Sequence, residues 1–66
     1  MNISLNGKET EIKKSMTISE LIRQKNLKPE KLVIEYNREI LSREKWSDTV
    51  LEDGDKIEML GFVGGG

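Results

Sequence analysis

The sequence contains neither cysteine nor histidine among its 66 residues. These absences exclude disulfide bonds, thiolate nucleophiles, imidazole bases and the usual zinc sites. Aromatic residues are scarce as well, with one Trp, one Tyr and one Phe, and Pro29 is the only proline. Because most self-contained enzyme mechanisms need side chains that this chain lacks, these mechanisms are excluded.

Long apolar runs and an excess of charge of one sign are also missing. No apolar stretch approaches the length of a membrane span, and residues 1–6 do not place a basic region before an apolar one, as a signal peptide would. Eleven basic and twelve acidic residues nearly cancel, whereas nucleic-acid binding favours a clear basic excess. We therefore expect a cytoplasmic protein that binds neither membranes nor nucleic acids.

The length and composition predict one small folded domain over residues 1–66. A chain of this size buries only about 60% of its unfolded surface on folding, so its core must be small and solid rather than hollowed for a ligand. Hydrophobic and charged residues each make up 35% of the sequence, a balance typical of globular domains rather than disordered or membrane-embedded ones.

The first residues show a hairpin pattern. Ile3 and Leu5 alternate with polar neighbours, Asn6-Gly7 interrupts, and Thr10 and Ile12 resume the alternation. Asn-Gly is favoured in turns whose two central residues both need positive φ, so we expect two antiparallel strands.

A short helix follows the hairpin. Thr17 and Glu20 fit a capping box, which satisfies free amides at a helix start. The apolar residues among 18–22 share one helical face and are expected to lie on a sheet. Asn26 suits the end of the helix, and Pro29 prevents its continuation.

The remaining pattern predicts strands and turns. Leu32 to Tyr36 reads as a central strand, and Ile40-Leu41 as a strand remnant that leads into a helical turn around Trp46, which we expect in the core. Asp53-Gly54-Asp55 is typical of a turn and lacks the further oxygen ligands of a calcium loop, so no metal is assigned. Lys56 to Leu60 forms the last strand.

This order of elements predicts an α+β fold in which a small mixed sheet packs against one helix, the β-grasp or ubiquitin-like arrangement. After the last strand, residues 61–66 are expected to form an extended, flexible tail. Glycine loses the most conformational freedom on ordering and adds nothing to a core. A run of glycines without Cβ atoms is suited instead to threading a narrow channel, where it would present a bare carboxylate to another protein.

Taken together, these segments resemble one family, the thiamine-biosynthesis sulfur carriers (ThiS) within the ubiquitin-like group. The resemblance covers essentially the whole chain and rests on the order of the Asn-Gly hairpin, the helix that begins with Thr17, the strand that ends at Asn37, Arg43-Glu44-Lys45-Trp46, Asp53-Gly54-Asp55 and Val63-Gly64-Gly65-Gly66. The family often has proline where this chain has Ser42, and it commonly requires two terminal glycines rather than three. The terminal pair here is still Gly65-Gly66.

The resemblance implies a protein substrate rather than an enzyme, and a chain that binds no cofactor of its own. An adenylating enzyme of the ThiF type would use ATP and Mg²⁺ to activate the carboxylate of Gly66. A persulfide-bearing enzyme would supply the sulfur that converts this end to a thiocarboxylate, which would then donate sulfur to thiazole synthase. Val63, Gly64 and Gly65 would enter the active sites of these partners.

The alternation in the last strand predicts a docking surface. It places Leu60 and Phe62 on the face opposite Ile57 and Met59, so we expect both to contact partner enzymes. The alternative is that Leu60 and Phe62 fold back onto the domain, since large apolar side chains in small domains usually belong to the core.

Three other functions share parts of this pattern. A sulfur carrier resembling the small subunit of molybdopterin synthase would have the same fold and glycine ending, but that class is usually longer and often has prolines before the tail. A carrier that serves another sulfur-containing metabolite fits the same residues. A noncatalytic ubiquitin-like interaction module would use the fold without any modification of its terminal carboxylate.

Overall fold

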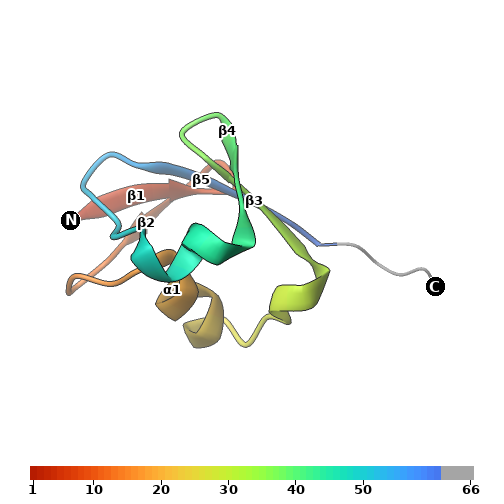
Figure 1. The fold of residues 1–66 in the computed structure, drawn as a ribbon. Helices are drawn as coiled ribbons and strands as arrows, with labels where there is room; N and C mark the ends of the chain where they lie inside the picture. Colours follow the sequence, from red (N-terminus) through yellow and green to blue (C-terminus); the bar gives the residue numbers. More distant parts are fainter. Residues whose placement is uncertain (62–66) are drawn as a thin grey trace.

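The computed structural model describes residues 1–61 and has the predicted α+β, β-grasp architecture. One mixed sheet forms a layer, and the helix and two short 3₁₀ helices lie on one side of it (Figure 1). The elements in chain order are β1 (Asn2–Leu5), β2 (Lys8–Glu11), α1 (Ile18–Gln24), η1 (Pro29–Lys31), β3 (Leu32–Tyr36), β4 (Glu39–Leu41), η2 (Arg43–Asp48) and β5 (Lys56–Gly61).

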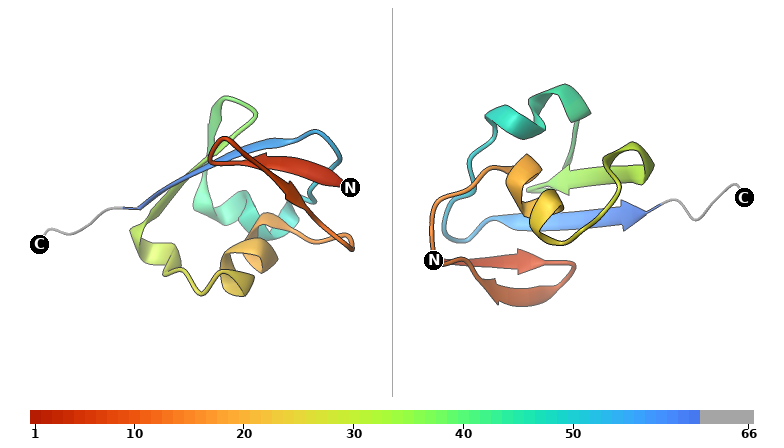
Figure 2. Two further views of the ribbon diagram at one scale, coloured as in Figure 1. Left: turned by 180° about the vertical axis from the view of Figure 1, so that it is seen from behind. Right: turned by 90° about the horizontal axis from the view of Figure 1, so that it is seen from below.

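The five strands are ordered β2-β1-β5-β3-β4. The pair β1 and β5 is parallel, whereas the other three neighbouring pairs are antiparallel. The segment that was expected to be a central strand, β3, is indeed internal, but the middle position of the sheet belongs to β5. The last strand is therefore held on both sides, and two views from behind and from below show it running through the sheet (Figure 2).

The two hairpin turns have the backbone that their asparagines favour. Asn6 and Gly7 both have positive φ, 52° and 78°, which confirms the tight turn expected between β1 and β2. Asn37 and Arg38 have φ of 50° and 76° in the turn between β3 and β4. Asparagine tolerates this region, whereas a bulky arginine seldom adopts it, so Arg38 occupies a strained position.

The ends of α1 are capped as the sequence predicts. The amide of Glu20 donates to the Thr17 hydroxyl at 3.2 Å, and the amide of Thr17 donates to the Glu20 carboxylate at 2.8 Å. At the other end Asn26 has a φ of 59°. The amides of Asn26 and Leu27 return to carbonyls of the last helical turn, which closes the helix with a Schellman motif.

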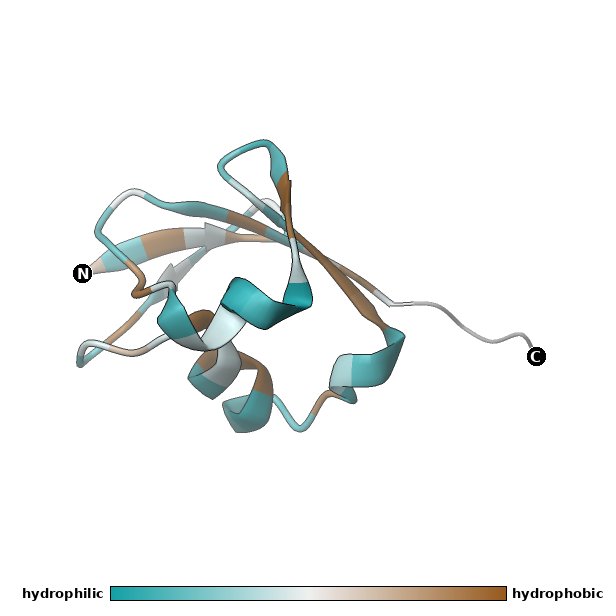
Figure 3. Ribbon diagram, viewed as in Figure 1, coloured by the Kyte–Doolittle hydropathy of each residue, from teal (hydrophilic) through white to brown (hydrophobic). Residues whose placement is uncertain are grey.

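The core lies between the sheet and the helices. The hydropathy view shows apolar segments in β1, β3, β5 and α1, the elements that border this space (Figure 3). Its buried members are Ile3, Ile12, Met16, Ile18, Leu21, Ile22, Ile34, Trp46, Leu51 and Ile57. Trp46 is a core residue, as expected, and its indole Nε1 donates to the Leu41 carbonyl at 3.0 Å. The guanidinium of Arg43 lies 5.8 Å from the centre of the indole ring, within cation–π distance.

Candidate functional site

The candidate site begins at the end of β5, because the predicted tail continues from its last residue, Gly61. The predicted site residues Phe62, Val63, Gly64, Gly65 and Gly66 lie outside the described residues. Their predicted roles, and the expected flexible tail, therefore stay predictions. What the structure describes is the support from which these residues would extend, together with the surfaces beside it.

The start of β5 is anchored by one buried carboxylate. Asp55 accepts hydrogen bonds from the Tyr36 hydroxyl at 2.7 Å and from the Asn37 side-chain amide at 3.2 Å. It also accepts one from the Glu52 backbone amide at 2.8 Å, within its own turn. Three donors around one buried carboxylate tie the turn before β5 to the end of β3, which fixes where the last strand starts.

The surroundings of Tyr36 shift the pKa of its hydroxyl group. Burial, followed by its hydrogen bond to Asp55 and the charges of Asp55 and Glu52, raises the pKa of Tyr36 to about 12. A phenol with this pKa stays protonated and donates its hydrogen bond throughout the physiological range. Tyr36 is therefore a neutral anchor for β5 rather than a general base.

Two asparagine side chains hold β5 from opposite edges. The Oδ1 of Asn37 accepts from the Lys56 amide at 2.8 Å, and the Oδ1 of Asn6 accepts from the Met59 amide at 2.7 Å. From the sequence, Asn6 is identifiable only as a turn residue, and neither contact with β5 was predicted. The sequence does contain an asparagine in each of these two turns. Predicting that both side chains reach β5 would also have required the strand order, which places the strands of these turns on either side of β5.

The outer face of the sheet, away from α1, carries the predicted docking residue Leu60. Leu60 is 54% exposed and lies directly opposite Val33 on β3. Ile40 on β4 is 66% exposed and pairs with Glu35, which in turn pairs with Glu58 of β5. Leu60 is therefore exposed, as the alternation predicts, and it has apolar and acidic neighbours; its contact with a partner stays a prediction.

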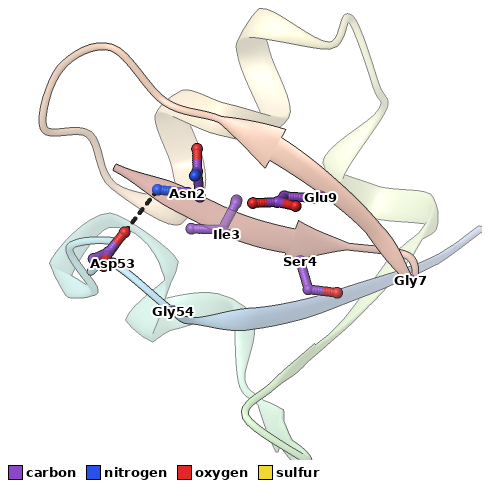
Figure 4. A pocket seen from close by; sticks show the side chains of 7 residues that line it. All are labelled: Asn2, Ile3, Ser4, Gly7, Glu9, Asp53 and Gly54. Carbon is purple, nitrogen blue, oxygen red and sulfur yellow. Dashed lines mark hydrogen bonds between the residues drawn. The ribbon is translucent and has the colours of Figure 1, made fainter.

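A separate groove lies along β1 and β2 (Figure 4). Its lining includes the side chains of Asn2, Ser4 and Glu9 together with the turn residues Asp53 and Gly54. The Asn2 amide donates to Asp53 Oδ1 at 2.7 Å, so Asp53 serves the turn, as expected. Glu9 lies directly opposite Ser4 in the pairing of β1 with β2, and residues 1–61 hold no cluster of three His, Cys, Asp or Glu side chains that could bind a metal.

No helix within residues 1–61 is both long enough and apolar enough to span a membrane. All buried side-chain nitrogen and oxygen atoms in this part of the chain have hydrogen-bond partners. The described domain thus lacks the orphaned buried polar atom that often points to a missing ligand.

Comparison with known proteins gives a consistent result. Residues 3–66 match the model of the ThiS family. The sulfur carrier protein ThiS of Bacillus subtilis is 38% identical over 65 residues, which cover 97% of this chain and 98% of that protein. A crystal structure of the thiamine biosynthesis protein ThiS from Geobacter metallireducens is 36% identical and superimposes with a TM-score of 0.85 over 100% of both chains.

Two further relatives are longer proteins. The thiazole synthase of Paramagnetospirillum magneticum is 33% identical and that of Magnetococcus marinus 35% identical, each over 66 residues and the whole of this chain. The chain spans only 20% of the length of either relative. Each of these thiazole synthases thus contains a segment similar to the complete domain described above.

Proposed function

This chain belongs to the ThiS family, and on that premise we propose that it is a sulfur carrier for thiazole formation in thiamine biosynthesis. The observation that carries the proposal is the family match, which extends over residues 3–66 and so includes the glycine run. The carrier is a protein substrate and sulfur donor for its partners, not a catalyst. The group that reacts is the carboxylate of Gly66.

The first step activates this carboxylate. A carboxylate resists nucleophilic attack because it already bears negative charge. In the adenylating partner, a carboxylate oxygen of Gly66 attacks the α-phosphorus of ATP and pyrophosphate leaves, with Mg²⁺ balancing the phosphate charge. The product is an acyl adenylate, whose AMP group leaves readily. Both ATP and Mg²⁺ are bound by the partner and not by this chain.

The second step brings in sulfur. The terminal sulfur of a partner's persulfide attacks the carbonyl carbon of Gly66, AMP leaves, and an acyl disulfide forms. A thiolate then attacks the partner's sulfur of that bond, which releases the carrier as a thiocarboxylate and leaves a disulfide behind. Because this chain has no cysteine, it cannot capture its own activated end or divert the sulfur by thiol exchange.

The domain supports this chemistry by position. β5 is paired on both sides and ends at Gly61. From Phe62 to Gly66 an extended backbone covers roughly 16 to 18 Å, which is enough for Val63, Gly64 and Gly65 to enter a partner's active-site channel. Leu60, and with it Phe62, is proposed to dock against the partner at the mouth of that channel.

We propose three partners, which the resemblance to the ThiS family implies. The ThiF-type adenylating enzyme and a persulfide-bearing sulfur donor act on Gly66, and thiazole synthase receives the sulfur. The relatives that are thiazole synthases and contain a similar segment support the last of these partners. A cytoplasmic location is proposed because the activation step consumes ATP.

Removal of Gly65 and Gly66 tests the proposal against a simple interaction module. The truncated carrier is expected to support no thiazole formation in a reaction that contains the adenylating enzyme, sulfur donor and thiazole synthase, while its affinity for the adenylating enzyme falls far less. A protein that worked only by docking would keep its full effect after truncation. The folded state of the truncated chain is checked by the tryptophan fluorescence of buried Trp46.

A further inference from the structure

The end of β5 is paired on one side only. On the β3 side, pairing continues to the last residue, where Leu32 lies opposite Gly61. On the β1 side, the pairing stops at Leu5 and Ile57, and beyond it only the Asn6 side chain reaches β5, through the Met59 amide. Seen from below, β5 runs past the end of the β1–β2 hairpin (Figure 2).

The free edge has defined hydrogen-bonding groups. Peptide groups two residues apart along a strand point to the same side. Since the Ile57 carbonyl and the Met59 amide both bond to Asn6 on the hairpin side, the Met59 carbonyl and the Gly61 N–H point to this side as well. None of the β1 or β2 strand residues pairs with them. An exposed strand edge of this kind is a template for another extended chain.

Glycine at position 61 fits this interpretation. A Cβ added at Gly61 would meet nothing within 4 Å, and its φ is not in the left-handed region. Neither packing nor backbone geometry within residues 1–61 therefore requires glycine here. Glycine inside a strand often marks a place where another backbone approaches closely.

An apolar groove lies beside the same edge. Gly61 is part of its lining, together with the apolar side chains Leu5, Leu27, Leu32 and Met59. Leu27 is 38% exposed although it is a large apolar residue. Two cations, Lys8 and Lys25, also line the groove, so an occupant that carries an apolar side chain and a carboxylate would match it.

We propose that thiazole synthase adds an extended segment to this free edge of β5. Its backbone accepts a hydrogen bond from the Gly61 N–H and donates one to the Met59 carbonyl. One apolar side chain of the segment fills the groove, and a carboxylate lies near Lys8 and Lys25. The inference rests on the proposed function. Thiazole synthase is the favoured partner because two thiazole synthases each contain a segment similar to this chain.

This pairing has a mechanical consequence for sulfur delivery. The added segment holds the residue from which the tail starts, so it sets the direction in which residues 62–66 enter the active site. Ordering the root of the tail before chemistry reduces the conformational freedom that must be lost at the reacting end. Docking and positioning of the thiocarboxylate are thereby coupled in one contact.

Amide hydrogen exchange tests the pairing directly. In the ¹⁵N-labelled carrier, the Gly61 amide is expected to exchange at least about tenfold more slowly when the cognate thiazole synthase is bound, whereas the Leu60 amide, which points toward β3, serves as the internal control. Unchanged Gly61 exchange in the saturated complex overturns the proposal. Protection by the adenylating enzyme and not by thiazole synthase overturns the choice of partner.

Two pairs of variants provide an independent test. Gly61→Pro removes the donor without breaking a bond inside the described chain and should weaken binding about tenfold, whereas Gly61→Ala keeps the donor and should cost only a few-fold. Leu27→Asp should weaken binding about tenfold, with Val50→Asp, at a position 50% exposed, as its control. Wild-type binding by both Gly61→Pro and Leu27→Asp contradicts the inference.

The same samples separate this inference from the proposed function. Each variant is first treated with the adenylating enzyme and sulfur donor, and its mass is measured. A wild-type chain that gains no sulfur refutes the proposed function itself. The other outcome is that Gly61→Pro and Leu27→Asp gain sulfur and also deliver it normally to thiazole synthase. This result leaves the carrier function in place and refutes only the strand pairing.

Discussion

At the scale of single residues, the buried carboxylate of Asp55 organises the start of the last strand. It joins the turn before β5 to Tyr36 and Asn37 at the end of β3. Such a carboxylate is stable in a small core because each contact is a hydrogen bond to a charged acceptor, which is stronger than one between neutral groups. A domain without disulfides uses this contact to hold the strand that bears its tail.

Tyr36 makes the stability of this contact depend on pH. Folding raises its pKa from the ordinary tyrosine value of 10.0 to about 12. The folded state therefore keeps its proton longer, so the stabilisation is complete below pH 10 and is lost as the pH rises from 10 toward 12. Tyr36→Phe should lower the free energy of unfolding at pH 7 by about 1 to 2 kcal/mol and flatten this alkaline decline.

Urea unfolding at several pH values measures both effects. Equal alkaline slopes for the wild-type chain and Tyr36→Phe would show that Tyr36 is not the residue responsible.

The sequence predicted part of this residue-scale picture. It identified Asp53-Gly54-Asp55 as a turn, and the turn is present, with Gly54 at a φ of 89°. It did not predict that Asp55 is buried while Asp53 is a surface turn residue. That difference depends on Tyr36, which is 19 residues away in sequence, and a local pattern contains no information about such a contact.

At the scale of elements, β5 connects the fold to the proposed chemistry. It occupies the middle of the sheet, its inner face contributes Ile57 to the core, and its outer face presents Leu60. Period-two alternation assigns these faces, so the exposure of Leu60 could be predicted from sequence. The strand order could not, because the parallel pairing of β1 with β5 joins segments about fifty residues apart, as in the pair Ser4 and Lys56.

Leu60 provides a test of the outer face as a docking surface. Leu60→Ser should weaken binding to the adenylating enzyme about tenfold, because an exposed apolar contact is lost while the core is untouched. Val50→Ser is the matched control, since Val50 is 50% exposed and Leu60 is 54% exposed. Phe62→Ala should act in the same direction as Leu60→Ser.

Isothermal titration of each variant gives the affinity, and thermal unfolding confirms the fold. Equal affinities for Leu60→Ser and Val50→Ser would remove the docking role of Leu60.

At the scale of the whole molecule, the domain has a solid core and no catalytic constellation in its described part. The chain contains no cysteine or histidine, and residues 1–61 hold no metal-binding cluster. In the proposed function, partner enzymes carry out the chemistry, while the domain supplies a strand that is paired on both sides, two candidate contact surfaces and the carboxylate at Gly66. The fold class and family could be predicted from the sequence because turns, caps and glycine tail all indicated the same arrangement.

The most direct test is the intact mass of the carrier after incubation with ATP, Mg²⁺, the cognate adenylating enzyme and a persulfide donor. Replacement of one oxygen by sulfur at Gly66 predicts a gain of about 16 Da. The chain without Gly65 and Gly66 is the control and should gain nothing. An unchanged mass of the full chain, with partners shown to be active, would contradict the carrier function.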